Sequence, residues 1–230
     1  MKLNYSRVLL TVALIFATKF GFAQSNEIKI EFIGNCGLYM TDGTTNIYAD
    51  FPYKSGAYNY MEFDKAELDS IKENSIFIFT HKHADHFSEK NMRKVLKEKE
   101  GLKFTPWKSN KLIKYFESIP ELHIQVFKTK HAFSLKHVSY LITWHGKKIF
   151  LSGDTTNAET IGEIKNIDWA FVPYWLLLDA RDKEIEIDAK MKGIYHWATV
   201  QVPSAEENYD NGKDLHPLTK PGEIIKIPYY

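Results

Sequence analysis

The chain has almost no cysteine, since Cys36 is the only one among its 230 residues. A single thiol cannot form an internal disulfide, so packing and metal binding must stabilise the fold. Cys36 lies in the segment Gly34-Asn35-Cys36-Gly37, which we expect to form a tight turn between the first two strands. This setting favours a small buried side chain over a reactive or metal-binding thiol.

An excess of charge of either sign is also missing, because the formal net charge is only +1. A nearly neutral chain offers little attraction to a polyanion, so we expect a small-molecule substrate and no nucleic-acid partner. The sequence contains no repeat, low-complexity tract or linker, and its hydrophobic content of 44% is sufficient for a buried core. These properties predict one domain.

The apolar stretch near the N-terminus, Val8–Ala17, is too short to span a bilayer comfortably. Residues 1–23 start with basic side chains and end in Gly21-Phe22-Ala23, a pattern typical of a secretory signal cleaved before Gln24. An uncleaved anchor is less favoured, and no lipid-anchoring cysteine follows. We expect an exported protein, periplasmic or secreted, with a mature domain at residues 24–230 and no stable membrane anchor. Cleavage would remove three basic residues and no acid, lowering the formal charge from +1 to −2.

Three histidines and an aspartate are concentrated in the segment His81-Lys82-His83-Ala84-Asp85-His86, directly after the apolar run Ile76–Thr80. The spacing of His81 and His83 puts both rings on one side of an extended chain, whereas a helix would separate them. A strand that is apolar at every position fits a layered α/β core, and such strands often carry sites at their C-terminal ends. Imidazole and carboxylate suit zinc, manganese or iron, and the lack of cysteine argues against a closed structural zinc site.

A helix is predicted directly after this segment. Ser88 can cap it, Phe87 can pack onto Met92, and Gly101 can end it. Asp85 and His86 would then lie in a strand-to-helix turn, pointing back past the end of the strand.

The segment Thr80–His86 resembles the HxHxDH motif of the metallo-β-lactamase-fold hydrolases. The resemblance covers nearly all of the mature chain, from Ile28 to about Ile227, and implies an α/β fold, the four-layered αββα sandwich. It also implies two bound metals with a shared ligand. The implied ligands are His81, His83 and His131 for one metal, Asp85, His86 and His196 for the second, and Asp154 as the bridge between them.

The third ligand of the first metal has two candidates. His131 is preferred because it follows the β-rich run Ile124–Phe127. His137 remains the alternative, because it directly precedes a predicted strand, which ends in a turn at His145. We interpret His123 and His145 as ordinary surface or turn histidines.

The remaining implied ligands also follow apolar runs. Asp154 lies in Gly153-Asp154-Thr155, where by itself it would be interpreted as a helix cap or a turn residue. His196 ends the short apolar segment Gly193–Tyr195. His216 competes weakly, because the following proline favours a surface loop and nothing strand-like precedes it.

The resemblance implies a metal-dependent hydrolase that uses two divalent ions, zinc in the first place and manganese or iron as alternatives. Asp85 could take the proton of the attacking water. With a carboxylate at position 154, the chain resembles the esterase, lactonase and phosphodiesterase branches of the family. A small ester, lactone or phosphoester is therefore the expected substrate, and hydrolysis of antibiotics is not expected. Two alternatives remain open. One is an iron-dependent redox enzyme, as among the flavodiiron and persulfide-dioxygenase relatives, and the other is a non-catalytic metal-binding protein.

The parts of the chain that would contact a substrate are less well defined. The aromatic-rich loop 51–61 could form a lid, and Tyr174, Trp175 and Trp197 could line an apolar pocket. Lys82 is expected to be solvated, because it points away from its histidine neighbours along an extended chain.

Overall fold

The computed structural model describes residues 26–209 and 213–230. The secretory signal predicted at residues 1–23 lies outside these ranges. Within them, no helix is both long enough and apolar enough to cross a membrane.

Two six-stranded sheets form the centre of the molecule. The strands of the first sheet are β1 (Glu27–Gly34), β2 (Gly37–Thr41), β3 (Asn46–Ala49), β4 (Ile76–Ile78), β5 (Leu102–Phe104) and β12 (Glu223–Pro228). Their order is β12-β1-β2-β3-β4-β5, antiparallel as far as β3 and parallel from β3 to β5. The first and last of the described strands are therefore neighbours, with Ile28 opposite Ile227.

The second sheet, like the first, has six strands and contains both parallel and antiparallel pairs. Its strands are β6 (Leu122–Thr129), β7 (His137–Trp144), β8 (Lys147–Leu151), β9 (Ile167–Pro173), β10 (Ala189–Tyr195) and β11 (Leu215–Pro217). Their order is β11-β10-β9-β8-β7-β6, parallel from β11 to β8 and antiparallel from β8 to β6. The hairpin predicted around His145 joins β7 to β8.

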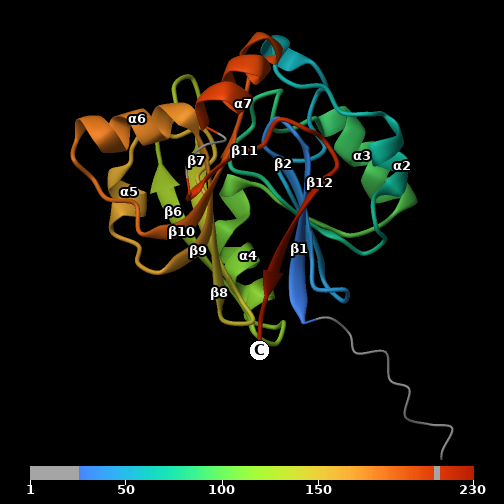
Figure 1. Ribbon diagram of the computed structural model, residues 1–230. Helices are drawn as coiled ribbons and strands as arrows, with labels where there is room; N and C mark the ends of the chain where they lie inside the picture. The colour runs from blue at the N-terminus through green and yellow to red at the C-terminus, as the bar shows by residue number, and fades with distance from the viewer. Residues whose placement is uncertain (1–25, 210–212) are drawn as a thin grey trace, which may run out of the picture.

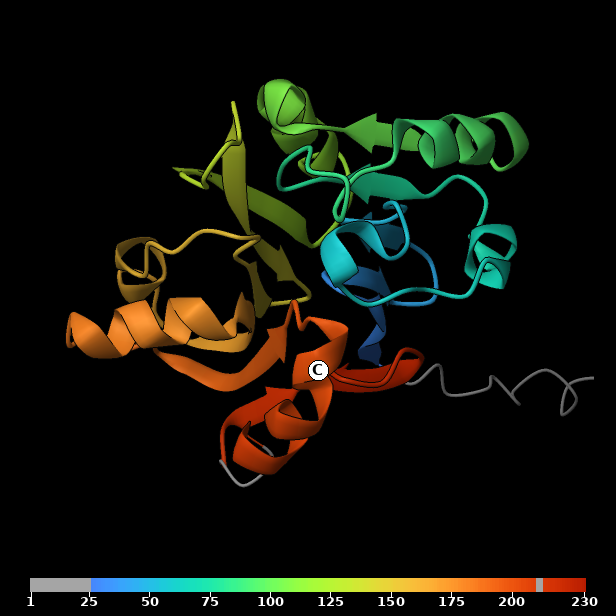
Figure 2. The same cartoon turned by 90° about the horizontal axis from the view of Figure 1, so that it is seen from above.

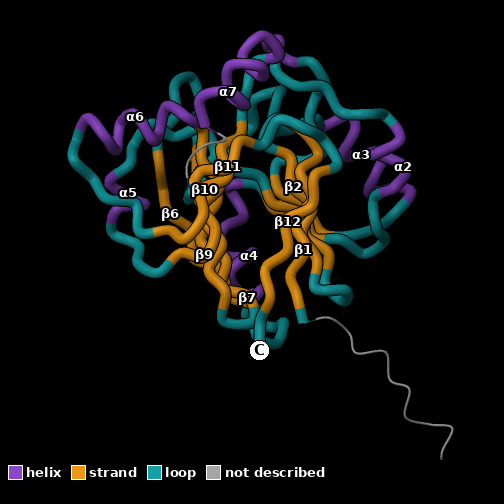
Figure 3. Tube along the Cα trace, in the orientation of Figure 1, coloured by secondary structure: helices purple, strands orange, loops and turns teal. Residues whose placement is uncertain are grey.

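The largest hydrophobic core lies between the two sheets, and helices cover their outer faces (Figures 1 and 3). Strand β4 shows why its sequence is apolar throughout, because Ile76 and Ile78 face the inter-sheet core whereas Phe77 packs under the outer helices. The helices are α2 (Ala66–Ser70), α3 (Glu89–Glu98), α4 (Ser109–Phe116), α5 (Glu159–Gly162), α6 (Tyr174–Asp182) and α7 (Val202–Tyr209), with 3₁₀ turns η1 (Ala57–Asn59), η2 (Pro106–Lys108) and η3 (Thr199–Gln201). This is the expected αββα sandwich.

The outer layers are formed by different helices. Helices α2 and α3 share a hydrophobic cluster with the first sheet, and α5 and α6 share one with the second, as the view from above also shows (Figure 2). Helix α3 begins as predicted, with the Ser88 side chain accepting the backbone N–H of Asn91 at 3.3 Å.

The prediction of a loop around His216 was wrong. His216 lies in β11, a short edge strand that runs parallel to β10, with Gly193 opposite it. Pro217 is tolerated because an edge strand needs to donate hydrogen bonds on one side only. The sequence signal was weak because the strand has only three residues.

Candidate metal centre

The predicted ligands converge at one edge of the sandwich, which we call the metal edge. Asp154 follows β8 and His196 follows β10, and the histidine-rich segment follows β4. His131 lies in the loop between β6 and β7. These segments meet at the upper edge in Figure 1, where helices α6 and α7 begin. The topology therefore brings together all seven residues that the sequence predicted.

A first group of donors consists of His81, His83 and His131. One ring nitrogen from each lies within 4.8 Å of the others. The ring centroids are 4.5 Å apart for His81 and His83, and 4.9 Å apart for His83 and His131. His81 is completely buried, whereas the other two are partly exposed. Three imidazoles at this spacing match the protein ligands of an open catalytic metal site.

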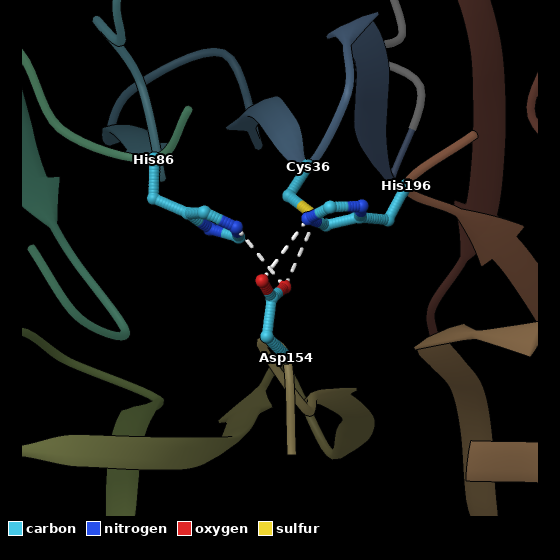
Figure 4. A group of neighbouring side chains, drawn as sticks. All are labelled: Cys36, His86, Asp154 and His196. Carbon is cyan, nitrogen blue, oxygen red and sulfur yellow. Dashed lines mark hydrogen bonds and ion pairs between the residues drawn. The ribbon is translucent and has the colours of Figure 1, made fainter. Parts of the chain in front are cut away.

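A second group surrounds the carboxylate of Asp154 (Figure 4). His86 Nε2 lies 3.0 Å from Asp154 Oδ1, and His196 Nε2 lies 3.0 Å from Asp154 Oδ2. Cys36 completes this group, with its sulfur 4.0 Å from Asp154 Oδ1. Asp85 lies beside the group, with Oδ2 3.1 Å from His196 Nε2 and 3.6 Å from His86 Nε2.

Asp154 lies between the two groups. Its Oδ2 atom faces His81 Nε2 at 3.8 Å and His131 Nε2 at 3.7 Å, besides the contact with His196. One carboxylate is thus within reach of donors on both sides, as a bridging ligand must be. The structure places Asp154 where the resemblance put the bridge.

The donor atoms fit metal ions better than they fit one another. Among the described residues, the Nε2 atoms of His81, His86 and His196 are buried and have no hydrogen-bond partner of acceptable geometry. Such atoms cost free energy when left unsatisfied. These nitrogens lie close to carboxylate oxygens, but not in hydrogen-bond geometry. The lone pairs of the nitrogens and oxygens therefore point into the same space. Divalent cations in that space would satisfy them all.

The protonation states of His81, His131 and Asp154 also fit metal binding. Burial lowers the pKa of His81 and of His131, which keeps both imidazoles neutral. Burial alone would raise the pKa of Asp154, but His196 and His86 together lower it well below its usual value. Neutral imidazole and ionised carboxylate are the forms that ligate metals.

His137 is adjacent to the site but makes other contacts. Its Nε2 accepts the backbone N–H of Asp154 at 3.0 Å, so its Nδ1–H donates to Thr129 Oγ1 at 2.7 Å. Burial lowers the pKa of His137 to about 3, which agrees with a neutral ring. Because both ring nitrogens are used, the geometry favours His131 as the third ligand, and His137 orients the loop of Asp154.

Asp50 is a site residue that the sequence did not identify as functional. Its buried carboxylate accepts the Thr80 hydroxyl at 2.7 Å and faces His86 Nδ1 at 2.9 Å. The Thr80 oxygen in turn lies 3.1 Å from His81 Nδ1. With the Nδ1 protons directed at these oxygens, the Nε2 atoms of both histidines are free for metal. Asp50 therefore orients one histidine in each group.

Two further contacts support the second group. Asn35 Nδ2 donates to the backbone oxygen of Asp85 at 2.9 Å. His196 is packed between aromatic rings, with Tyr60 at 4.0 Å and Trp175 at 4.9 Å between centroids. The loop 51–61 thus supplies a wall of the site. Trp197 does not join it, because its ring stacks on Tyr174 and its N–H donates to a backbone oxygen.

The other histidines lie away from both groups. His123 is exposed on β6, and His145 bonds Asp42 and Glu121. His216 bonds Glu223. None of the three approaches the metal edge within the described residues, as the sequence indicated.

The sequence matches no protein-family model and no curated protein. In structure, it is similar to Igni18, a novel metallo hydrolase from Ignicoccus hospitalis, with a TM-score of 0.65 and 14% identity, covering 89% of this chain and 100% of that one. It is also similar to YhfI of Bacillus subtilis, a metallo-β-lactamase-fold protein, with a TM-score of 0.62 and 13% identity over 88% and 100% of the two chains. A protein of Parabacteroides distasonis, described as a metal-dependent hydrolase, gives a TM-score of 0.59 and 20% identity over 83% and 92%.

The similarity extends to a protein with a different chemistry. CmlA, a diiron β-hydroxylase from Streptomyces venezuelae, gives a TM-score of 0.55 and 12% identity over 88% of this chain and 54% of that one. At such identities the likeness establishes a fold and leaves the reaction open. The chain has the metallo-β-lactamase fold, and the histidine and aspartate cluster at its metal edge fits a metal site.

Proposed function

We propose that the protein is a metal-dependent hydrolase with two divalent metals, zinc in the first place, that acts on a small ester, lactone or phosphoester. The observation that carries this proposal is the position of Asp154, with histidine nitrogens at 3.0 to 3.8 Å on both sides of one carboxylate. A structural metal site has no need of two adjacent donor groups joined in this way.

Each metal has a defined set of side chains. The first group, His81, His83 and His131, would hold one ion, and Asp85, His86 and His196 would hold the other, with Asp154 shared. Bound there, the metals would supply Lewis acidity toward a carbonyl or phosphoryl oxygen and lower the pKa of a water molecule. Cys36 lies beside the second group of donors, but the second ion would have its ligands without it.

Asp85 is placed to accept a proton. Burial alone would raise the pKa of Asp85, but His196 lowers it overall, so the carboxylate is ionised near neutral pH. Its Oδ1 atom is buried without a hydrogen-bond partner in the described chain, whereas Oδ2 faces His196 and His86. Oδ1 could therefore take the proton of the attacking water while Oδ2 keeps its position beside His196 and His86.

The compartment forms part of the proposal. We propose that the protein is exported and works outside the cytoplasm, supported by the signal-like segment at residues 1–23. A fold without disulfides in that compartment would gain stability from the two metals, because a ligand that binds only the folded state stabilises it.

The test begins with the metal content of the purified mature protein, determined by elemental analysis. Chromogenic esters, lactones and phosphodiesters are then screened with the native protein, the chelator-treated protein, and protein reloaded with zinc, manganese or iron. We expect two metals per chain, loss of turnover with chelator, and recovery on reloading. Asp85→Asn should lose turnover, whereas His123→Gln, which alters an exposed histidine away from the site, is the matched control.

Two results would contradict the proposal. A protein that binds two metals and turns over none of the three substrate classes would favour a non-catalytic role. Native iron combined with consumption of oxygen would favour the redox chemistry for which CmlA provides the structural precedent.

A further inference from the structure

A cavity of about 440 Å³ lies between the start of helix α4 and strands β6 and β7. Its charged lining residues are all lysines, namely Lys108, Lys111, Lys128 and Lys136. Ser109, Asn110 and apolar residues such as Val126 complete the wall. We call this space the lysine cavity.

The positive charge of the lysine cavity is not neutralised by the protein. Within the described ranges, none of the four lining lysines forms an ion pair, although many other lysines of the chain do. The formal charge of the whole chain is only +1, so this concentration is local. Ammonium groups without carboxylate partners attract an anion from solution.

Trp107, a lining residue of the lysine cavity, has two ammonium groups near its ring. Lys82 Nζ lies 5.0 Å and Lys136 Nζ lies 5.9 Å from the centroid of its indole ring. The ring is half exposed, so its packing does not depend on burial in the core. Cation–π contacts of this kind hold charged side chains in place without neutralising them.

Two short segments of chain connect the lysine cavity with the metal centre. Lys82 lies between His81 and His83 in the sequence, and Lys136 precedes His137, whose ring accepts the N–H of Asp154. A substrate that spans both sites would have its charged end beside Trp107 and its reacting bond at the metal centre. The sequence suggested solvation for Lys82, which agrees with its exposure but misses this arrangement.

We propose that the lysine cavity binds an anionic group, a carboxylate or a phosphate, of the substrate that is hydrolysed at the metal centre. The proposal rests on the proposed function and narrows the substrate to an ester with a charged tail. Lysine supplies point charges rather than a fixed fork of donors, so the site selects for charge more than for the geometry of one anion.

The test reads binding at the cavity directly, by NMR of the metal-loaded protein. The chain has five tryptophans, and Trp107→Phe identifies the indole N–H signal of Trp107. Succinate and inorganic phosphate are titrated separately. We expect one or both to shift the Trp107 signal, which distinguishes a carboxylate from a phosphate preference, and added potassium chloride to weaken the effect.

Matched variants then test the role of charge. Lys108→Gln with Lys136→Gln should raise the dissociation constant about tenfold, because two screened attractions are lost. Lys90→Gln with Lys97→Gln removes two exposed charges from α3 and should leave the dissociation constant unchanged. If neither anion moves the Trp107 signal, or if the cavity variant binds like the native protein, the proposal is wrong.

A kinetic arm separates this proposal from the proposed function. The cavity variant should raise KM for p-nitrophenyl hemisuccinate about tenfold and leave KM for the neutral p-nitrophenyl butyrate unchanged. An equal effect on both esters would overturn the assignment of the cavity to substrate. Anion binding at Trp107 without hydrolysis of any ester would support the anion-binding site and would refute only the proposed hydrolase activity.

Discussion

Replacing Asp50 by asparagine should weaken both metal sites at once, although Asp50 belongs to neither group of donors. The carboxylate faces His86 Nδ1 at 2.9 Å and accepts the Thr80 hydroxyl at 2.7 Å, and the Thr80 oxygen accepts the Nδ1 proton of His81. A second carboxylate oxygen accepts the backbone N–H of Thr80 at 2.7 Å. All these contacts require an acceptor at Asp50.

An asparagine amide cannot replace this arrangement. If its oxygen stays on the Thr80 backbone N–H, its NH₂ group faces both His86 and the Thr80 hydroxyl. His86 would then accept at Nδ1 and carry its proton on Nε2, where the metal should bind. The reversed Thr80 hydroxyl would change His81 in the same way. Loss of a partner that orients metal-bound histidine typically costs 10- to 100-fold in affinity, and we expect about that loss at each site.

The assay is a competition between the protein and a chromogenic chelator, read as the affinity of each of two zinc ions. Thr80→Val is the matched control, because it cuts the connection to His81 and leaves the contact of Asp50 with His86. It should weaken one metal only. Unfolding of the metal-free Asp50→Asn protein should be easier by about 2 to 4 kcal/mol, since buried charge-assisted hydrogen bonds are lost. Two zinc ions bound with native affinity in Asp50→Asn would refute the reasoning.

The other predictions concern the ligands, the compartment and a surface histidine. Asp154→Ala should bind at least one metal fewer per chain by elemental analysis, and an unchanged count would exclude the bridge. His131→Ala should cut turnover by orders of magnitude while His137→Ala keeps both metals, and the opposite outcome would exchange their roles. Mass spectrometry of the exported protein should find Gln24 at the N-terminus, and a retained signal segment would contradict export by cleavage. Burial alone would lower the pKa of His145, but hydrogen bonds to two acidic side chains raise it. The stabilisation that these hydrogen bonds provide is therefore complete below the ordinary histidine pKa and is lost as the pH rises through the raised pKa. His145→Gln should lower the free energy of unfolding in urea by about 1 kcal/mol at pH 6 and by almost nothing at pH 9.

Local sequence patterns predicted the parts of the site that depend on one strand and its following turn. The spacing of His81 and His83 requires an extended chain, and the apolar run before them requires cover on both faces, as strand β4 has. The capped helix after the motif follows from Ser88, whose preference for that position is local. These constraints act over a few residues, so one sequence displays them.

Contacts between distant segments could not be read in this way. Asp50 reaches Thr80 and His86 only because β3 and β4 are parallel neighbours, with Ala49 opposite Ile78. The sequence likewise favoured His131 without excluding His137, because both flank the start of β7. The backbone N–H of Asp154 distinguishes them, and it arrives from β8 through sheet pairing.

Three residues at the metal edge have unfavourable backbone angles. Asn35, Asp50 and His196 all have left-handed backbone angles, with φ of 48°, 47° and 65°. Such angles cost roughly 1 kcal/mol or more per residue other than glycine, although asparagine, aspartate and histidine tolerate them best. Glycine would relieve that strain, but it would remove the amide that holds Asp85, the carboxylate that orients two histidines, and a predicted ligand. Strained residues concentrate where the surrounding structure fixes them, and here the fixing contacts are those that position metal donors. The sharp turns after β1, β3 and β10 therefore serve to direct side chains into the site.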